Sequence, residues 1–356
     1  MRIGFFGDGP WAERALTPLA KDPRYAIAFV AVRASRPDQK LIELAKRHGI
    51  AVLCPASVNS AESLAEIGRF AADLHVSMSY DQILRKDILG LPPRGTLNCH
   101  AGALPFYRGR NPLTWAIING EREFGVTVHW VDLGIDTGDI VRQVKVPIGP
   151  KDTYATLLTS AIDVCADTLV RAVSDVHDKT DQRIVQSTID PVGMYCCRRR
   201  EGDEEIDWTA DSVSIERFVR ALVPPGPGAR TTWKDAAYAI LAAELIDGAK
   251  PYVGAAGEVI GKDDTGILVK SGDTFVRLTR WAPVQPDGSL GDPGIADAPR
   301  GARLGQNLKA AIALSEARIA ALEAQLERIV GGIDAAAARD DIPLSSQIGR
   351  GRKQPL

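Results

Sequence analysis

Apolar and polar positions follow two different periods along the first half of the chain. Short apolar runs, such as residues 1–7 and 25–33, are each followed by a segment in which apolar residues recur every three or four positions. The first pattern is typical of buried strands and the second of amphipathic helices. Further strands are predicted at residues 51–55, 73–80, 96–100 and 126–131, and helices at residues 11–22, 40–50, 60–72, 81–92, 112–120 and 152–176. The alternation of strand and helix up to residue 141 predicts an α/β fold with a Rossmann-like, doubly wound, mostly parallel sheet.

The pattern changes in the second half of the chain. From residue 231 to about residue 283, short strands separated by glycine turns predict a small open, OB-like β-barrel. After a linker rich in Pro, Gly and Asp, apolar residues from Leu308 to Ile329 recur at alternating spacings of four and three, broken by Ser315. This is a heptad pattern, and both a coiled coil that joins two chains into a homodimer and a helix docked on the body satisfy it.

These patterns divide the chain into six parts. We expect an α/β domain over residues 1–188, a linker segment over 189–230, the β-barrel over 231–285, a second linker over 286–304, a helix over 305–331 and a disordered tail over 332–356.

Composition narrows the class of protein. Hydrophobic residues make up 45% of the 356 residues and charged residues 25%, which is ordinary for a soluble globular protein. The net charge of −2 gives no general attraction to nucleic acid or anionic lipid, so neither is expected as a partner. No apolar window is long enough to span a bilayer, and we expect a cytoplasmic location. The five cysteines have no paired spacing, so neither a metal site nor a disulfide framework is predicted.

The candidate chemistry lies between residues 95 and 141. Asn98 and His100 are two apart in a predicted strand and therefore share a face, and a loop rich in Gly and Pro follows them. Asp136 lies in a second polar loop that also follows a strand. Histidine exchanges protons near neutral pH, a neighbouring carboxylate favours its charged form, and an amide can donate to a developing oxyanion. Spacing alone leaves two interpretations open. In the first, these residues form a catalytic group. In the second, His100 is an ordinary strand histidine and Asp136 only forms a turn.

The segment NCHAGALPFYRGRNPLTWAIINGE, followed by GVTVHWVDLGIDTGDIV, resembles the signature of formyltransferases that use N10-formyltetrahydrofolate. The resemblance implies that Asn98 stabilises the transition state, that His100 exchanges the proton and that Asp136 raises the pKa of the histidine. It also implies direct transfer of the formyl group to a primary amine, with folate as cosubstrate and no metal. The residues that it assigns to folate or substrate binding are Gln82, Ile83, Leu84, Arg110, Asp132, Leu133, Gly134 and Ile135.

Within this family, the sequence favours a nucleotide-linked amino sugar as the acceptor, in a pathway such as lipopolysaccharide O-antigen synthesis. The reason is the short connection at residues 32–39, because enzymes that act on tRNA typically carry an enlarged, basic loop there. Methionyl-tRNA formyltransferase is the alternative with the same chemistry. A formyltetrahydrofolate hydrolase or a non-catalytic folate-binding protein is the alternative from another class.

Overall fold

The computed structural model describes residues 1–305 and 308–340. The chain divides into two compact units. The first contains Met1–Thr231 and Ala237–Gly305, and the second contains Thr232–Ala236 and the chain from Gln306 onward.

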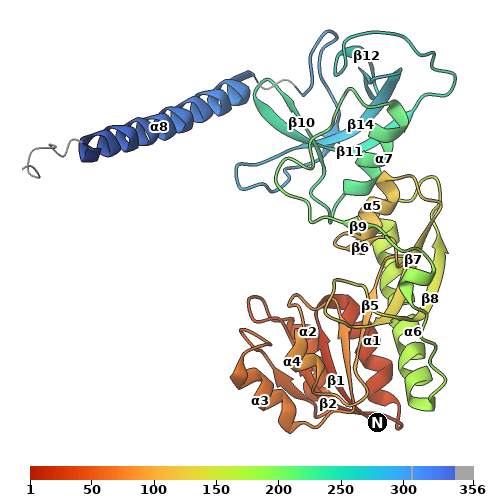
Figure 1. Ribbon diagram of the computed structural model, residues 1–356. Helices are drawn as coiled ribbons and strands as arrows, with labels where there is room; N and C mark the ends of the chain where they lie inside the picture. The colour runs from red at the N-terminus through yellow and green to blue at the C-terminus, as the bar shows by residue number, and fades with distance from the viewer. Residues whose placement is uncertain (306–307, 341–356) are drawn as a thin grey trace, which may run out of the picture. The chain divides into compact units, whose positions relative to one another are not determined.

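A seven-stranded sheet forms the centre of the N-terminal part, with the strand order β3-β2-β1-β4-β5-β7-β8 (Figure 1). The strands from β3 to β5 are parallel, whereas β7 and β8 are antiparallel to their neighbours. The predicted α/β class and mostly parallel sheet are therefore confirmed. The strands are β1 (Arg2–Gly7), β2 (Ala26–Ala31), β3 (Ala51–Leu53), β4 (Leu74–Met78), β5 (Thr96–His100), β7 (Glu123–Trp130) and β8 (Ile140–Pro147).

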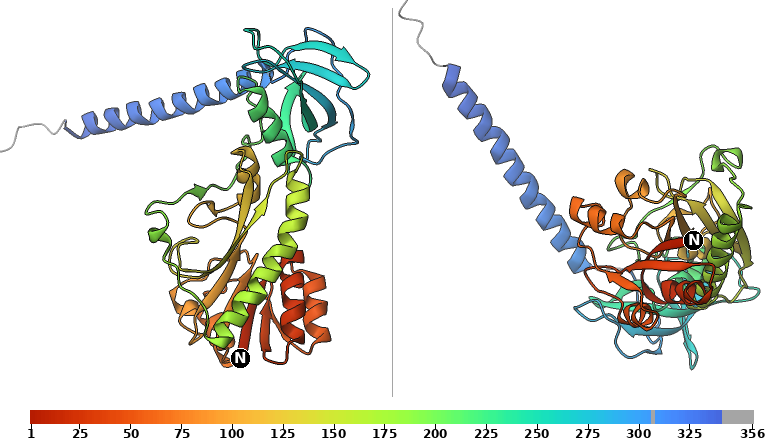
Figure 2. Two further views of the ribbon diagram at one scale, coloured as in Figure 1. Left: turned by 90° about the vertical axis from the view of Figure 1, so that its right-hand side faces the viewer. Right: turned by 90° about the horizontal axis from the view of Figure 1, so that it is seen from below.

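Helices cover both faces of this sheet, as a doubly wound fold requires. The N-terminal part contains α1 (Gly9–Lys21), α2 (Gln39–Arg47), α3 (Ala61–Arg69), α4 (Lys86–Leu89), α5 (Pro112–Ile118) and α6 (Tyr154–Asp178). Alternation along β1 separates two cores, because Ile3 and Phe5 pack with α1, α2 and α6 while Phe6 packs with α3 and α4. The long helix α6 lies beside α1 (Figure 2).

Side-chain caps explain where several of these helices begin. Ser60 accepts a hydrogen bond from the backbone N–H of Ser63 at the start of α3. Thr153 and Thr156 form a reciprocal capping box at the start of α6. Such caps satisfy backbone N–H groups that have no partner within the helix.

The segment predicted as a helix over residues 81–92 is only partly helical. Its helix is α4, Lys86–Leu89, while residues 81–85 form a loop. Side chains hold this loop in place: Gln82 Oε1 accepts from the N–H of Val58, and Asn59 Oδ1 accepts from the N–H of Arg85. Tertiary hydrogen bonds thus replace the first helical turn.

The region after α6 contains the short strand β9 (Tyr195–Cys196), which pairs with β6 (Arg108–Gly109), and the helix α7 (Ser212–Leu222). A mainly antiparallel sheet follows, in the order β10-β11-β14-β13-β12 with β15 on β14. Its strands are β10 (Ala229–Trp233), β11 (Ala236–Leu245), β12 (Val259–Asp263), β13 (Gly266–Lys270), β14 (Phe275–Pro283) and β15 (Gly294–Ile295). This sheet agrees with the β-rich second domain predicted from the sequence.

The last described element is α8, Leu308–Asp340. It continues past the predicted end at residue 331, so residues 332–340 are helical where a disordered tail was expected. The rest of that tail, residues 341–356, lies outside the described residues. Among the described helices, none combines the length and apolar character needed to cross a lipid bilayer.

Candidate functional site

The carboxyl end of β5 carries Asn98 and His100. Asn98 is half-buried and His100 is 8% exposed. Because side chains two apart on a strand share a face, both project to the same side of the sheet, as the sequence predicted. Cys99 between them points the other way, into the core beside Cys165.

The antiparallel pairing of β5 with β7 brings a second histidine to this face. Asn98 lies directly opposite His129 in the register, and Asn98 Nδ2 lies 3.2 Å from His129 Nε2. His129 Nδ1 lies 2.8 Å from the carbonyl oxygen of Trp130, which can only accept, so Nδ1 carries the proton. In the neutral ring Nε2 accepts from the Asn98 amide, whereas in the imidazolium form it donates to the carboxylate of Asp136. His129 was missed in the sequence; a polar residue in an otherwise apolar strand was its only signal.

Asp136 completes the cluster from the loop between β7 and β8. Its Oδ2 lies 3.6 Å from His100 Nδ1, and its Oδ1 lies 3.4 Å from His129 Nε2. The backbone N–H of Gly109 also donates to Oδ2, at 2.8 Å. Asp136 adopts a left-handed backbone conformation with φ of 54°, which aspartate tolerates better than most residues. Gln186 donates to its carbonyl oxygen, so this turn is fixed from both sides.

These contacts keep Asp136 ionised. Burial, the largest single influence, raises the pKa of this carboxyl group, but the charge of His100, the contacts to His129 and the Gly109 N–H together lower it by more. The net result is a pKa well below the usual range for aspartate. A carboxylate therefore faces both imidazole rings at neutral pH.

The other side of the His100 ring faces the backbone of the following loop. His100 Nε2 lies 2.6 Å from the carbonyl oxygen of Tyr107. A Cβ atom added to Gly102 would lie 2.6 Å from the same nitrogen, so only glycine leaves room for the ring. Because a carbonyl oxygen accepts and never donates, Nε2 carries a proton, and Nδ1 is the nitrogen left to exchange one.

A cavity of about 400 Å³ opens over this cluster. All the predicted site residues line it except Leu133, whose side chain is 74% exposed. The structure therefore brings together Gln82, Ile83, Leu84, Asn98, His100, Arg110, Asp132, Gly134, Ile135 and Asp136. His129 and Arg33, which the sequence did not single out, lie in the same lining.

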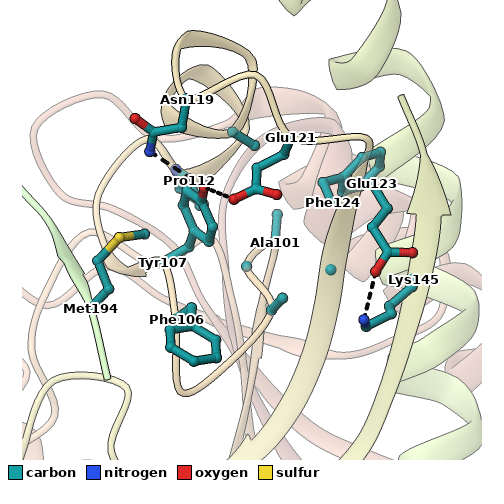
Figure 3. Close-up of a pocket in the computed structure, with 14 residues that line it drawn as sticks. Ala101, Phe106, Tyr107, Pro112, Asn119, Glu121, Glu123, Phe124, Lys145 and Met194 are labelled. Atoms are coloured by element: carbon teal, nitrogen blue, oxygen red, sulfur yellow. Dashed lines mark hydrogen bonds and ion pairs between the residues drawn. The ribbon is translucent and has the colours of Figure 1, made fainter. Parts of the chain in front are cut away.

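A second cavity, of about 480 Å³, is lined by residues 101–103, Phe106 and Tyr107 of the loop that holds His100 (Figure 3). The hydroxyl of Tyr107 donates to Glu121 at 2.6 Å and accepts from Asn119 at 3.3 Å. On the opposite wall, Lys145 and Glu123 form an ion pair at 2.5 Å (Figure 3). The hydrogen bond to Glu121 anchors Tyr107, whose carbonyl oxygen lies against His100 Nε2.

Within the described part of the chain, no three His, Cys, Asp or Glu side chains are grouped so as to hold a metal ion. The chemistry that the cluster offers is proton exchange at an imidazole backed by a carboxylate, next to an amide donor.

Comparison with known proteins identifies the family. The model of the formyl transferase family matches residues 1–173, and the model of the formyl transferase C-terminal domain matches residues 199–288. The methionyl-tRNA formyltransferase of Methylacidiphilum infernorum is 34% identical over 85% of this chain and 96% of its own length. That of Pseudomonas fluorescens strain SBW25 is 34% identical over 79% of this chain and 88% of its own length.

A solved structure shows the same fold. It is the N-formyltransferase of Helicobacter canadensis in complex with folinic acid and dTDP-3-aminofucose, with a TM-score of 0.58 over 78% of this chain and 98% of its own. Its sequence is only 20% identical to this chain, so the likeness is one of fold.

These comparisons correct one prediction from the sequence. The amino-sugar acceptor, and with it the role in O-antigen synthesis, is wrong, because the relatives at 34% identity are methionyl-tRNA formyltransferases. The short loop at residues 32–39 and the net charge of −2 misled the prediction. Phosphate contacts are local, so neither feature excludes a nucleic acid substrate. With both domain models matched in order and relatives of this identity along most of its length, the chain belongs to the formyl transferase family.

Proposed function

We propose that this protein is a methionyl-tRNA formyltransferase, which moves the formyl group of N10-formyltetrahydrofolate to the amine of methionyl-tRNA. The observation that carries this proposal is the match to methionyl-tRNA formyltransferases over 85% of the chain. The cluster of Asn98, His100 and Asp136 supports the same chemistry, because it lies together in one cavity.

The lining of that cavity suits a folate. Ile83 and Ile135 present apolar side chains that are 63% and 43% exposed, next to polar groups of Gln82 and Asp132. Apolar walls with a few placed polar groups are typical of sites for flat heterocycles. N10-formyltetrahydrofolate supplies the formyl group there, and the remaining chemistry falls to the protein.

Each residue of the cluster then has one task. His100 Nδ1 takes the proton that the amine loses as it attacks the formyl carbon, since Nε2 is committed to the carbonyl oxygen of Tyr107. The same nitrogen returns that proton to N10 of the folate when the bond from the formyl carbon to N10 breaks. Asp136 stabilises the imidazolium that forms. Asn98 donates one amide N–H toward His129 and keeps a second for the developing oxyanion.

A cluster of arginines next to the cavity supports a nucleic acid substrate. Arg110 lines both the catalytic cavity and a neighbouring one that is shared with Arg198, Arg199 and Arg200. Glu201 and Glu204 also line this neighbouring cavity and offset part of its charge. The buried Nη1 of Arg199 has no hydrogen-bond partner among the described residues. Arginine forks suit phosphate groups, so we infer that this cavity receives the tRNA backbone near its amino-acyl end.

The test is formyl transfer assayed by mass spectrometry of the acceptor. The full-length protein is supplied with N10-formyltetrahydrofolate and either methionyl-tRNA or dTDP-3-aminofucose. We expect formyl-methionyl-tRNA as the product and a loss of at least about 100-fold in rate for His100→Ala and for Asp136→Ala. Transfer to the sugar alone, or near-full activity of either folded variant, would overturn the proposal.

A control without any acceptor separates transfer from hydrolysis. Release of formate at a rate equal to that of the complete reaction would make the protein a hydrolase.

A cytoplasmic location remains a prediction from the sequence.

A further inference from the structure

The helix α8, Leu308–Asp340, carries an exposed apolar stripe. The side chains of Ile312, Ile319, Leu322, Leu326 and Ile329 are each between 53% and 61% exposed. With Ser315, they follow one another at spacings of three and four residues along one face. A stripe with this period is the seam of a coiled coil, since 3.5 residues per turn keep it facing a partner helix.

We propose that α8 pairs with α8 of a second copy of this chain in a parallel, two-stranded coiled coil. In heptad terms, Ile312, Ile319 and Leu326 occupy a positions, while Ser315, Leu322 and Ile329 occupy d positions. β-branched residues at a with leucine at d favour two strands in parallel pairs, and this seam follows that preference at two of its three a positions and at its central d position.

Charges beside the seam decide the orientation. Arg318 occupies a g position and Glu323 the e position five residues later. In a parallel pair the g residue of one helix meets that e residue of the other, so two Arg318–Glu323 pairs form across the interface. In an antiparallel pair e positions meet each other, and Glu316 would face Glu323. Like charges across a seam are unfavourable, which favours the parallel arrangement over the antiparallel one.

The first measurement is the mass of the full-length protein by sedimentation velocity over a range of concentrations. We expect a species of twice the 38.3 kDa chain mass that dissociates on dilution. Leu322→Asp places a charge in the seam and should give a monomer at every concentration. A wild type that stays monomeric, or a Leu322→Asp variant that still dimerises, would overturn the proposal.

A charge exchange tests the orientation separately. Arg318→Glu and Glu323→Arg, each alone, should weaken the dimer by about tenfold, because each puts like charges together. The double variant should recover the affinity of the wild type. Glu327→Arg, at an outer b position, is the matched control and should leave the affinity unchanged. Single exchanges without effect, or a double variant as weak as the singles, would contradict the parallel register.

Discussion

His100 Nε2 and the carbonyl oxygen of Tyr107 lie 2.6 Å apart, which fixes the tautomer of the proposed catalytic histidine. The loop that provides this carbonyl also provides the Gly109 N–H that donates to Asp136. One loop therefore positions both the ring and its carboxylate partner. Its glycine at 102 and its tyrosine at 107 become testable parts of the site.

Gly102→Ala should inactivate the protein without unfolding it. The new Cβ would lie 2.6 Å from His100 Nε2 and 2.7 Å from the carbonyl oxygen of Tyr107, so the ring must move. A displacement of about 1 Å at a catalytic group costs on the order of 100-fold in rate. We expect kcat/KM for formyl transfer to fall by that order while the circular dichroism spectrum is retained.

The control for this variant is Gly68→Ala. Gly68 lies inside α3, where an added Cβ meets only Leu91, at 3.8 Å. Alanine should stabilise that helix by up to about 1 kcal/mol and leave the rate unchanged. A Gly102→Ala variant as active as Gly68→Ala would show that the loop does not constrain His100.

Tyr107→Phe should lower the rate severalfold by loosening the loop. It removes only the hydroxyl that donates to Glu121, and a hydrogen bond to a charged group contributes about 1.5–3 kcal/mol. Because Glu121 is exposed, we expect a loss of unfolding free energy near the lower limit of that range. Urea titration measures this loss. Glu123→Gln breaks only the exposed pair with Lys145 on the same cavity, so it should change stability by less than about 0.5 kcal/mol.

His129→Phe should lower kcat by roughly tenfold or more. The ring remains, but Asn98 loses the nitrogen that lies 3.2 Å from its amide, and Asp136 loses one of its two imidazole neighbours. Both groups then sample other positions, which weakens transition-state contacts. His75→Phe is the control, because His75 is buried in β4 between Phe6 and Phe29 and does not line the catalytic cavity. Equal kcat values for the two variants would remove His129 from the site.

His75 should make the fold sensitive to mild acid. Burial lowers the pKa of this histidine from 6.5 to about 4, so the native protein keeps it neutral while the unfolded chain protonates it. The unfolded state therefore binds more protons between these values, and stability is lost as the pH falls from 6.5 toward 4. The loss amounts to about 3 kcal/mol over the full window.

Urea unfolding at several pH values from 7 to 4 measures this effect. The free energy of unfolding of His75→Phe should fall less steeply with pH than that of the wild type. Parallel curves for the two proteins would assign the acid sensitivity to other groups. Asp136 contributes to the acid sensitivity in a different pH range. Its pKa is lower in the native state than in the unfolded chain, so the stability that it provides is lost only as the pH falls below about 4.

Local sequence patterns determined the order of helices and strands up to β7 and the shared face of Asn98 and His100. Such features depend on backbone periodicity and on residues a few positions apart, which the sequence displays directly. The motifs around His100 and Asp136 also identified the family correctly. They did not identify the acceptor, because loop length and net charge are weak indicators of where phosphates bind.

Only the tertiary structure decided the partners of these residues. The register of β5 against β7 sets His129 opposite Asn98, and it depends on the pairing of strands that are distant in sequence. The closure of loop 101–109 brings the Tyr107 carbonyl and the Gly109 N–H onto His100 and Asp136. Neither relationship follows from a period of two or 3.6 residues. Both arise from packing between separate segments, and the pattern within one segment does not indicate which other segment it contacts.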